Sequence, residues 1–327
     1  MKKTVRPDIL LVGTGPIGIE YAKILLKLKK KFVAVGRSKS SCQNFLAQTG
    51  ITAHPGGIQQ WLYMQSKLGE DLPAKAIIAA SENELGIVTL LCLKSGVRNI
   101  LVEKPGGLNV NEIKQVAKES MKKNAKVFIG YNRRQYASVK MCKKLLKQDG
   151  GVTSFNFEFT EWGHVIKKIK KAPGVKEQWF LHNSTHVIDL AFFLGGIPKK
   201  IITFSKGSLP WHPAGAIFTG AGETASGALF SYQANWAAPG RWGVEILTKK
   251  HRYIFRPLEK LQVQQLGSVE ISEIPLSNNY DSSFKPGFFE QTRAFILGQY
   301  KTLCTIEEQK KHCVVYTKIL RNSSKGL

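Results

Sequence analysis

The chain has 327 residues, of which 43% are hydrophobic and 22% charged, and its 48 Lys and Arg against 23 Asp and Glu leave a net charge of +25. This composition excludes a disordered, collagenous or disulfide-rich protein, no apolar run approaches the roughly 20 residues of a membrane span, and the length suits about two domains. The positive charge would attract polyanions, but the basic residues are scattered without a nucleic-acid-binding motif, so we expect no specific nucleic-acid partner and no membrane association.

Residues 1–131 alternate between short apolar runs and segments with helical spacing, the pattern of a parallel sheet with crossover helices. The expected strands are almost entirely apolar, as strands covered on both faces must be, and lie at 9–12, 32–35, 76–80, 100–102 and 127–129. Helices are expected at 17–30, 84–94 and 110–122, with a short strand and a helix near 58–68 in the segment 50–73. We therefore predict an α/β fold whose first domain, 1–131, is a doubly wound Rossmann sheet.

The pattern changes after Gly130. A helix at 137–146, a strand at 153–159, a basic loop at 167–178 and a helix at 184–194, which Asn183 or Ser184 would cap, are followed by consecutive strands without room for crossover helices. These strands are expected at 201–205, 224–236, 242–248, 252–256 and 261–265, and two helices, at 287–298 and 306–321, close the chain. We predict a second α/β domain, 132–327, with a large open, mainly antiparallel sheet.

A glycine motif follows the first expected strand and opens the first expected helix. The motif is Gly13, Thr14, Gly15, Pro16, Ile17 and Gly18, a GxGxxG. Its first glycine permits the tight turn, the second lets the backbone approach a pyrophosphate, and the third lets the helix pack on the strand, while the helix N-terminus offers N–H donors to the anion. In this context the motif predicts a dinucleotide site.

The residue that reads the cofactor's ribose is expected at the end of the second strand, about 20 positions beyond the motif. Here Gly36 stands where an acidic residue would accept from the 2′-hydroxyl of NAD, and Arg37 follows it. The exchange favours a 2′-phosphate and hence NADP over NAD. The alternative is that Arg37 stacks on adenine or faces solvent.

The five cysteines, an odd number, form no CxxC pair and no Cys/His cluster at metal spacing. We expect no metal site and a reducing, cytoplasmic location. The apolar stretch near the start is interrupted by Asp8, so we expect no signal peptide there.

Four motifs occur in a characteristic order: GTGPIG at 13–18, EKP at 103–105, GYNRR at 130–134 and HVIDL at 186–190, followed by Gly195 and Gly196. In order and spacing, this set resembles the Gfo/Idh/MocA oxidoreductases, the glucose–fructose oxidoreductase and inositol dehydrogenase family. The resemblance covers essentially the whole chain. It implies hydride transfer between a nicotinamide cofactor and a sugar or cyclitol carbon, on a Rossmann domain joined to an α/β domain whose open sheet commonly forms the dimer interface.

The resemblance also implies roles for individual residues. Lys104, at the carboxyl end of an expected parallel strand where ligands of such sheets bind, would contact substrate and cofactor. His186 would be the acid/base, for which an ordinary imidazole pKa of about 6.5 is suited, and Asp189, three residues on along one helix face, would bind a substrate hydroxyl or orient the imidazole. The expected cofactor contacts are the glycine motif together with Arg37, Ser38, Ser81, Glu103 and Lys104.

One position departs from the family pattern. Many relatives have an Asp four residues before the catalytic His, and this chain has His182 there. The carboxylate that would raise the basicity of His186 is therefore missing. Either Asp189 or His182 takes its place, the reaction differs in detail, or the site is not catalytic.

Further residues are candidates for the substrate site. Arg133 and Arg134 have the planar forks that hold a phosphate or carboxylate, although pairing with protein carboxylates is an equal alternative. Aromatic and polar groups flank the basic loop and suit a sugar-binding lid, with core packing as the alternative for the tryptophans. The predicted substrate-binding residues are Asn132, Arg133, Arg134, Trp162, Trp179, His182 and Asn183, with His164 beside them.

The predicted function is an NAD(P)-dependent sugar dehydrogenase or reductase acting on a CH–OH group of a sugar, cyclitol or nucleotide sugar. The charge favours an anionic substrate, such as a nucleotide-linked sugar. The alternative is a non-catalytic, dinucleotide-binding regulator of the same fold. We also expect a homodimer or a higher homo-oligomer, because small residues (Ala225, Gly227 and Ala228) in the expected strand 224–236, which pairs with 242–248, would let a second sheet approach.

Overall fold

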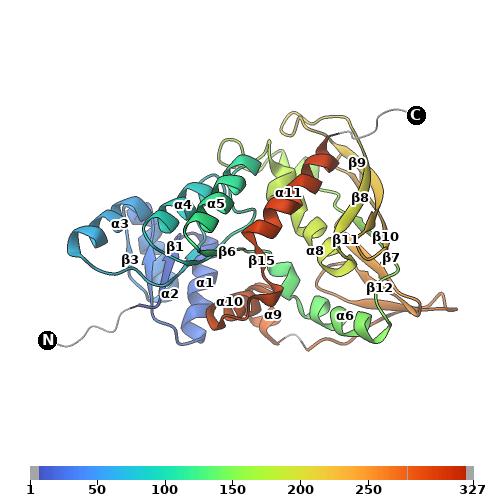
Figure 1. The fold of residues 1–327 in the computed structure, drawn as a ribbon, viewed down its shortest axis with the longest axis horizontal. Helices are drawn as coiled ribbons and strands as arrows, with labels where there is room; N and C mark the ends of the chain where they lie inside the picture. Colours follow the sequence, from blue (N-terminus) through green and yellow to red (C-terminus); the bar gives the residue numbers. More distant parts are fainter. Residues whose placement is uncertain (1–6, 278, 322–327) are drawn as a thin grey trace. The chain divides into compact units, whose positions relative to one another are not determined.

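The computed structural model describes residues 7–277 and 279–321. The chain forms two compact units (Figure 1), each built from two segments. The first unit combines the chain up to Tyr131 with Ser283–Lys310, and the second combines Asn132–Ser282 with the chain from Lys311 onward. Among the described residues, no helix has both the length and the apolar character to cross a membrane.

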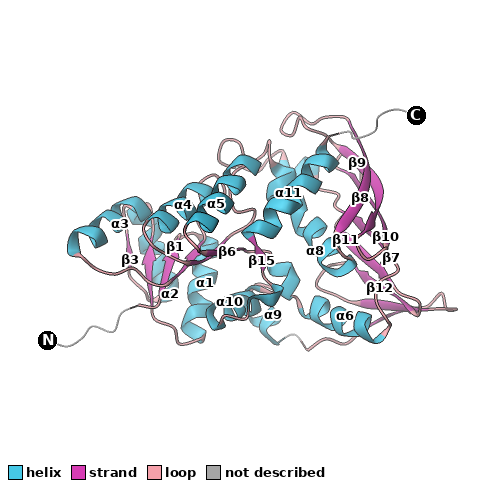
Figure 2. Ribbon diagram, in the orientation of Figure 1, coloured by secondary structure: helices cyan, strands magenta, loops and turns pink. Residues whose placement is uncertain are grey.

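A seven-stranded sheet forms the centre of the first unit (Figure 2). Its strands in spatial order are β15 (Cys304–Thr305), β6 (Lys126–Ile129), β5 (Asn99–Val102), β4 (Lys75–Ile78), β1 (Ile9–Val12), β2 (Phe32–Val35) and β3 (Ala53–His54). All neighbouring pairs are parallel except β15 with β6. The predicted Rossmann sheet is confirmed; the antiparallel edge strand β15, only two residues long, was not predicted.

Helices cover both faces of this sheet. On one face lie α3 (Gly57–Leu68), α4 (Leu85–Lys94) and α5 (Val110–Lys122), and on the other lie α1 (Pro16–Lys27), α2 (Lys39–Thr49) and α10 (Phe288–Leu297) (Figure 1). Because both faces are covered, the central strand β1 is apolar and buried at all four positions.

The helix α10 completes the core of the first unit. Phe288 packs on Tyr21 of α1 with ring centroids 5.1 Å apart, and the Gln291 side chain donates to the Tyr21 hydroxyl at 2.9 Å. Phe288 and Phe295 belong to the same buried cluster as the apolar residues of β1 and α1. The expected boundary placed α10 in the second domain, and this expectation was wrong. The apolar face of α10 covers α1, a long-range contact that sequence spacing does not reveal.

The second unit is built on an eight-stranded sheet. Its spatial order is β14 (Ile271–Glu273), β13 (Gln262–Gln265), β12 (His251–Phe255), β11 (Gly243–Leu247), β7 (Ser154–Glu158), β10 (Leu229–Asn235), β9 (Ile217–Thr224) and β8 (Pro198–Lys206). Only the pair β7 and β10 is parallel. The predicted mainly antiparallel second sheet is confirmed.

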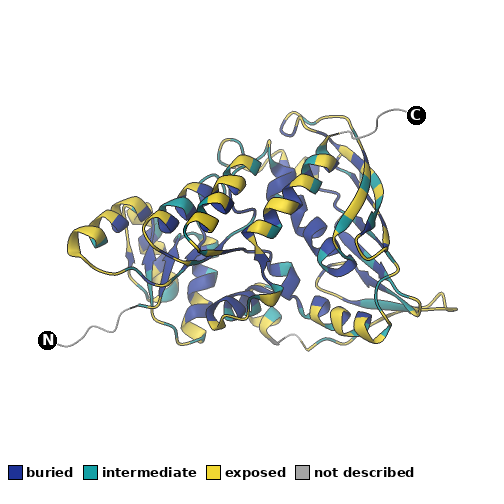
Figure 3. Cartoon of the chain, in the orientation of Figure 1, coloured by how far each residue is buried: buried dark blue, intermediate teal, exposed yellow. Residues whose placement is uncertain are grey.

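The inner face of this sheet carries aromatic residues that pack against α8 (Thr185–Gly195). Phe192 of the helix meets Phe155 and Phe157 of β7 edge to face, at 6.0 and 5.6 Å between ring centroids. Figure 3 shows α8 buried along its length. The helix that carries His186 is thereby held firmly on the sheet.

Further helices complete the second unit and the connections. They are the 3₁₀ turn η1 (Asn132–Gln135), α6 (Ala137–Gln148), α7 (Gly163–Ile166), the π-helical turn η2 (Phe180–Ser184), α9 (Asn279–Ser283), the 3₁₀ turn η3 (Tyr300–Thr302) and α11 (Ile306–Leu320). The chain passes from the first unit to the second within α11.

Two local expectations for the second unit were wrong. The expected strand 224–236 is interrupted by a turn around Gly227, whose φ is 89°, so that β9 ends at Thr224 and β10 begins at Leu229. The helix expected at 184–194 is present as α8, one residue later, but the expected cap is wrong, because the π-helical turn runs directly into α8 and Ser184 makes no capping hydrogen bond.

Candidate functional site

The glycine motif lies in the turn between β1 and α1, as predicted. Gly13 has a φ of 117°, and a Cβ there would lie 2.2 Å from the carbonyl oxygen of Ala79, so this turn requires glycine. A Cβ on Gly15, in contrast, would meet no atom within 4 Å. The open space at Gly15 and the free N–H groups at the start of α1 form a cradle for an anion such as a pyrophosphate.

The end of β2 has no room for an acidic side chain. A Cβ on Gly36 would lie 2.4 Å from the Thr14 hydroxyl oxygen and 2.5 Å from the Cys42 sulfur. Arg37 follows with an exposed side chain, and the Ser38 hydroxyl caps α2 by accepting from the backbone N–H of Ser41 at 3.2 Å. The end of β2 therefore offers a cation, hydroxyl groups and a helix N-terminus, but no carboxylate.

Arg37 makes one ion pair, which the sequence analysis did not foresee. Its Nη1 lies 2.6 Å from Oε1 of Glu84, at the start of α4, and Ser81 donates to the other Glu84 oxygen at 3.4 Å. The pair is largely exposed, so it contributes little to stability. An arriving phosphate can compete with Glu84 for this guanidinium.

Glu103 and Lys104 follow β5. The Glu103 carboxylate accepts from the Tyr21 hydroxyl at 2.6 Å, and burial raises the pKa of Glu103 against the opposing effects of that bond and of Lys104. Burial likewise raises the pKa of Tyr21. Glu103 is thus held by the core, whereas Lys104, partly exposed, stands beside it.

The predicted cofactor residues gather at one edge of the sheet. Residues 13–18 follow β1, 36–38 follow β2, Ser81 follows β4, and Glu103 and Lys104 follow β5. Since β1, β2, β4 and β5 are parallel neighbours, their carboxyl ends meet at the same edge. Ligands of open α/β sheets bind at this edge.

The second unit places both predicted histidines and Asp189 along one continuous helical stretch. His182 lies in the π-helical turn η2, and His186 and Asp189 lie in α8. All three are buried. The ring of His186 lies 6.2 Å from that of Trp242, between centroids.

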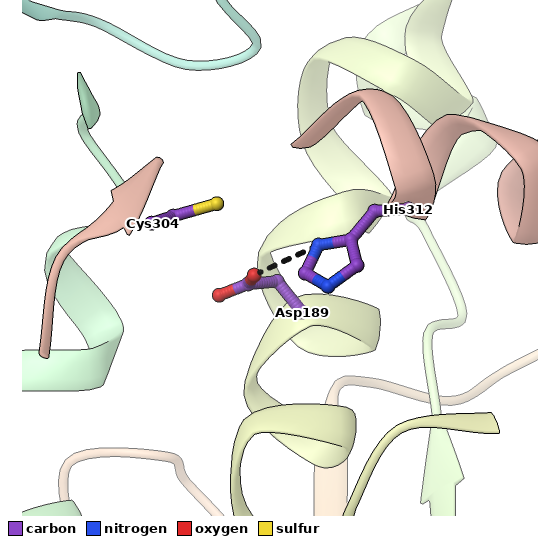
Figure 4. A group of neighbouring side chains, drawn as sticks. All are labelled: Asp189, Cys304 and His312. Carbon is purple, nitrogen blue, oxygen red and sulfur yellow. Dashed lines mark ion pairs between the residues drawn. The ribbon is translucent and has the colours of Figure 1, made fainter. Parts of the chain in front are cut away.

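Asp189 is engaged by other protein groups. Arg134 donates through Nε at 2.8 Å and through Nη2 at 2.5 Å to its two carboxylate oxygens, and His312 Nδ1 lies 3.6 Å from Oδ1 (Figure 4). Arg134 is 3% exposed and Asp189 1% exposed. The expected substrate contacts of Arg134 and Asp189 therefore need correction, because each side chain satisfies the other in a buried bidentate pair.

Glu161, which the sequence analysis overlooked, is a second buried carboxylate. It accepts from the Asn183 amide at 3.0 Å and from the Ser184 hydroxyl at 2.8 Å. Burial raises its pKa against those hydrogen bonds. Asn183 and Ser184, which follow His182 in the chain, thus hold the carboxylate of Glu161.

The two predicted tryptophans differ. Trp179 is buried and meets Trp211 edge to face at 6.3 Å, which corresponds to the core-packing alternative. Trp162 is 46% exposed, donates to the carbonyl oxygen of Gly240 at 2.9 Å and lies near the ring of His164. Of the two, only Trp162 has a surface for a ligand.

Trp242 is the centre of a cationic cluster. The guanidinium carbons of Arg133 and Arg241 lie 4.8 and 4.6 Å from its ring centroid, and Arg241 also lies 4.7 Å from the ring of Trp162. Neither Arg241 nor Trp242 was singled out from the sequence, because both lie at the start of the expected strand 242–248 and belong to no recognisable motif.

Comparisons with known proteins support the fold. No protein-family model matches the chain, and no curated protein matches it. Solved structures with the same fold include a levoglucosan dehydrogenase in complex with NADH and levoglucosan (15% identity, TM-score 0.75, 97% of this chain and 96% of that one). They also include the WlbA dehydrogenase from Bordetella pertussis in complex with NADH and UDP-GlcNAcA (15%, 0.70, 98% and 97%) and an NAD binding oxidoreductase from Klebsiella pneumoniae (15%, 0.71, 96% and 96%). At these identities the similarity establishes the fold alone.

Proposed function

We propose that the protein is an NAD(P)-dependent oxidoreductase that transfers a hydride between nicotinamide and the carbinol or carbonyl carbon of a sugar, cyclitol or nucleotide sugar. The observation that carries this proposal is the open anion cradle at Gly15, at the sheet edge where the other predicted cofactor residues gather. Similar folds named for levoglucosan and for UDP-GlcNAcA complexes favour a sugar substrate.

The residues have distinct proposed roles. His186 takes the hydroxyl proton during oxidation and returns it during reduction, and Lys104 stabilises the developing alkoxide. The bound nicotinamide accepts or supplies the hydride. Asp189 keeps Arg134 in place. Glu161, held by Asn183, is the carboxylate that supports the helical stretch with His182 and His186.

A substrate panel tests the activity. Nucleotide sugars, sugar acids and free cyclitols are incubated with each cofactor, and the absorbance of the reduced nicotinamide is followed. Turnover with at least one member is expected. A folded, cofactor-bound protein that turns over none of them contradicts the enzyme and supports a dinucleotide-binding regulator, which His182 in place of the family Asp favours.

We infer that NADP is the preferred cofactor, because Gly36 cannot carry an acid and Arg37 with Ser38 suits a 2′-phosphate. Arg37→Ala is expected to weaken NADPH binding about tenfold to a hundredfold, as loss of a charged hydrogen bond would, and to leave NADH binding unchanged. Nicotinamide fluorescence titrations measure both.

Arg98→Ala is the matched control, since Arg98 precedes β5 and so belongs to the opposite edge of the sheet. It should bind both cofactors like the unmodified protein. Tighter binding of NADH than of NADPH by the unmodified protein would contradict the NADP preference.

We further propose a homodimer formed through the outer face of the second sheet. Four large apolar side chains are exposed there, those of Ile202, Phe204, Ile217 and Leu229. An apolar hollow of about 620 Å³ lies on the same face, across β7, β10, β9 and β8. The predicted small residues need correction: Ala225 and Gly227 lie in the turn after β9, whereas Ala221 lies on the exposed face of β9.

Leu229→Asp is expected to shift the protein from dimer to monomer at micromolar concentration, because the carboxylate would be desolvated in the interface. Light scattering measures the mass. Leu266→Asp, at a position that is 82% exposed in the loop after β13, should stay dimeric. A monomeric unmodified protein would refute the interface.

The proposed location and the proposed absence of a nucleic-acid partner rest on the composition of the chain and on the state of its cysteines. The five cysteines are free and buried, which suits a reducing cytoplasm. We propose no nucleic-acid partner, and a metal ion has no role in the proposed reaction.

A further inference from the structure

A cavity of about 310 Å³ in the second unit is lined mainly by cationic and apolar groups. Of its seven lining residues three are arginines and one is acidic: Arg133, Arg241, Trp242, Arg256, Pro257, Leu258 and Glu259. The volume is at the small end for ligand sites, so it suits one charged group of a ligand.

Two of these arginines have no ion-pair partner among the described residues, and the more distant charges of Glu259 and Glu161 act on Arg133 without a direct contact. Within residues 7–277 and 279–321, neither Arg133 nor Arg241 makes an ion pair, and the buried Nε of Arg133 has no hydrogen-bond partner. Burial is the main cause that lowers the pKa of Arg133, and the nearby charge of Arg241 adds to it. A buried guanidinium with an unused donor is costly, and an anion that accepts from it removes that cost.

Trp242 holds the two guanidinium groups in place. Both lie within 5 Å of its ring centroid, at 4.8 Å for Arg133 and 4.6 Å for Arg241. Stacking on one indole favours the delocalised cations and restricts their orientation, although the like charges repel each other. Two oriented guanidinium groups beside one ring suit an oxyanion, which accepts hydrogen bonds from both.

The neighbouring acidic groups are occupied. Glu158 pairs with Arg256 at 3.1 Å, and Glu259 accepts from the Tyr136 hydroxyl at 3.4 Å. Arg256 is 53% exposed in this pair and keeps donors on the solvent side. The lining of the cavity, with three arginines and Glu259, is net cationic.

We propose that this cavity binds the phosphate or carboxylate oxyanion of the substrate, so that the enzyme acts on an anionic sugar. Arg133 and Arg241 bind the oxyanion, and Arg256 assists from the rim. Trp242 also faces His186 at 6.2 Å between ring centroids, which brings the oxyanion site beside the group proposed to move the proton. This inference rests on the proposed oxidoreductase function and adds the charge of its substrate.

The test is calorimetric binding to the full chain saturated with its preferred cofactor. Inorganic diphosphate and UDP-glucose represent phosphate, glucuronate represents carboxylate, and glucose is the neutral probe. Saturable binding of one oxyanion class and no binding of glucose is expected, and the class that binds identifies the source of the oxyanion.

Arg241→Gln should weaken that binding about tenfold to a hundredfold. Arg252→Gln is the matched control, because Arg252 lies in the same unit, in β12, but pairs with Glu245. It should bind like the unmodified protein. Both side chains are partly exposed, so both variants should fold.

Binding of none of the three oxyanions, or equal weakening by the two substitutions, overturns the oxyanion site. NADPH affinity, measured on the same samples, separates this failure from that of the proposed function. Retained NADPH binding without oxyanion binding rejects the cavity alone, and absence of binding of both cofactors rejects the oxidoreductase itself.

Discussion

Asp189→Asn is expected to lower the free energy of unfolding of the second unit by about 3–5 kcal/mol. The substitution leaves the guanidinium of Arg134, 3% exposed, without its bidentate carboxylate partner. Removal of one member of a buried pair costs more than the pair itself contributes, because the remaining charge stays desolvated.

Denaturant unfolding of the full chain, followed by tryptophan fluorescence, measures this loss. Five of the six tryptophans (Trp162, Trp179, Trp211, Trp236 and Trp242) belong to the second unit, so the signal reports mainly on it. Glu273→Gln is the control, because its pair with Lys260 is about half exposed and should contribute less than about 1 kcal/mol.

A double variant separates a structural role from a catalytic one. Arg134→Met combined with Asp189→Leu removes both buried charges and should recover most of the lost stability. If Asp189→Asn costs no more than the exposed control, the pair does not support the second unit in the way described here.

His186→Gln is expected to lower kcat about 10²-fold to 10⁴-fold with the substrate found in the panel, because the amide cannot accept and return the hydroxyl proton. Glutamine retains a polar side chain of similar length at this buried position. Cofactor affinity should stay unchanged, since the predicted cofactor residues belong to the first unit.

Steady-state kinetics and nicotinamide titrations measure the two quantities on one preparation. His251→Gln serves as the control, because His251 is partly exposed, pairs with Asp149 and belongs to no predicted site. Unaltered kcat in His186→Gln would remove the proposed acid/base, and equal losses in both variants would indicate a general effect of the substitution.

The first sheet was predictable because its signals are local. The apolar runs that form β1, β2, β4, β5 and β6, and the glycine turn before α1, lie within short windows of sequence. The strands between residues 217 and 235 could not be delimited, because one turn with Gly227 separates two strands of similar composition.

The chemistry of the second unit was less predictable. The spacing of His186 and Asp189 places them on one helical face, but Arg134, 55 positions away, determines what Asp189 does. Glu161 and Arg241 lie in loops, where sequence periodicity gives no signal. Tertiary contacts, and not local patterns, decide which polar side chains remain available to a ligand.

The return of the chain to its first unit has a consequence during synthesis. The ribosome completes all the parallel strands long before it makes α10, so Tyr21 and the neighbouring apolar surface of α1 initially have no Phe288 or Gln291 to cover them. An N-terminal half-chain should therefore expose apolar surface and be prone to aggregation or to binding by chaperones. Nascent chains that end before residue 283 should stay sensitive to protease, and chains that extend past residue 310 should become resistant, because residues 283–310 complete the first unit.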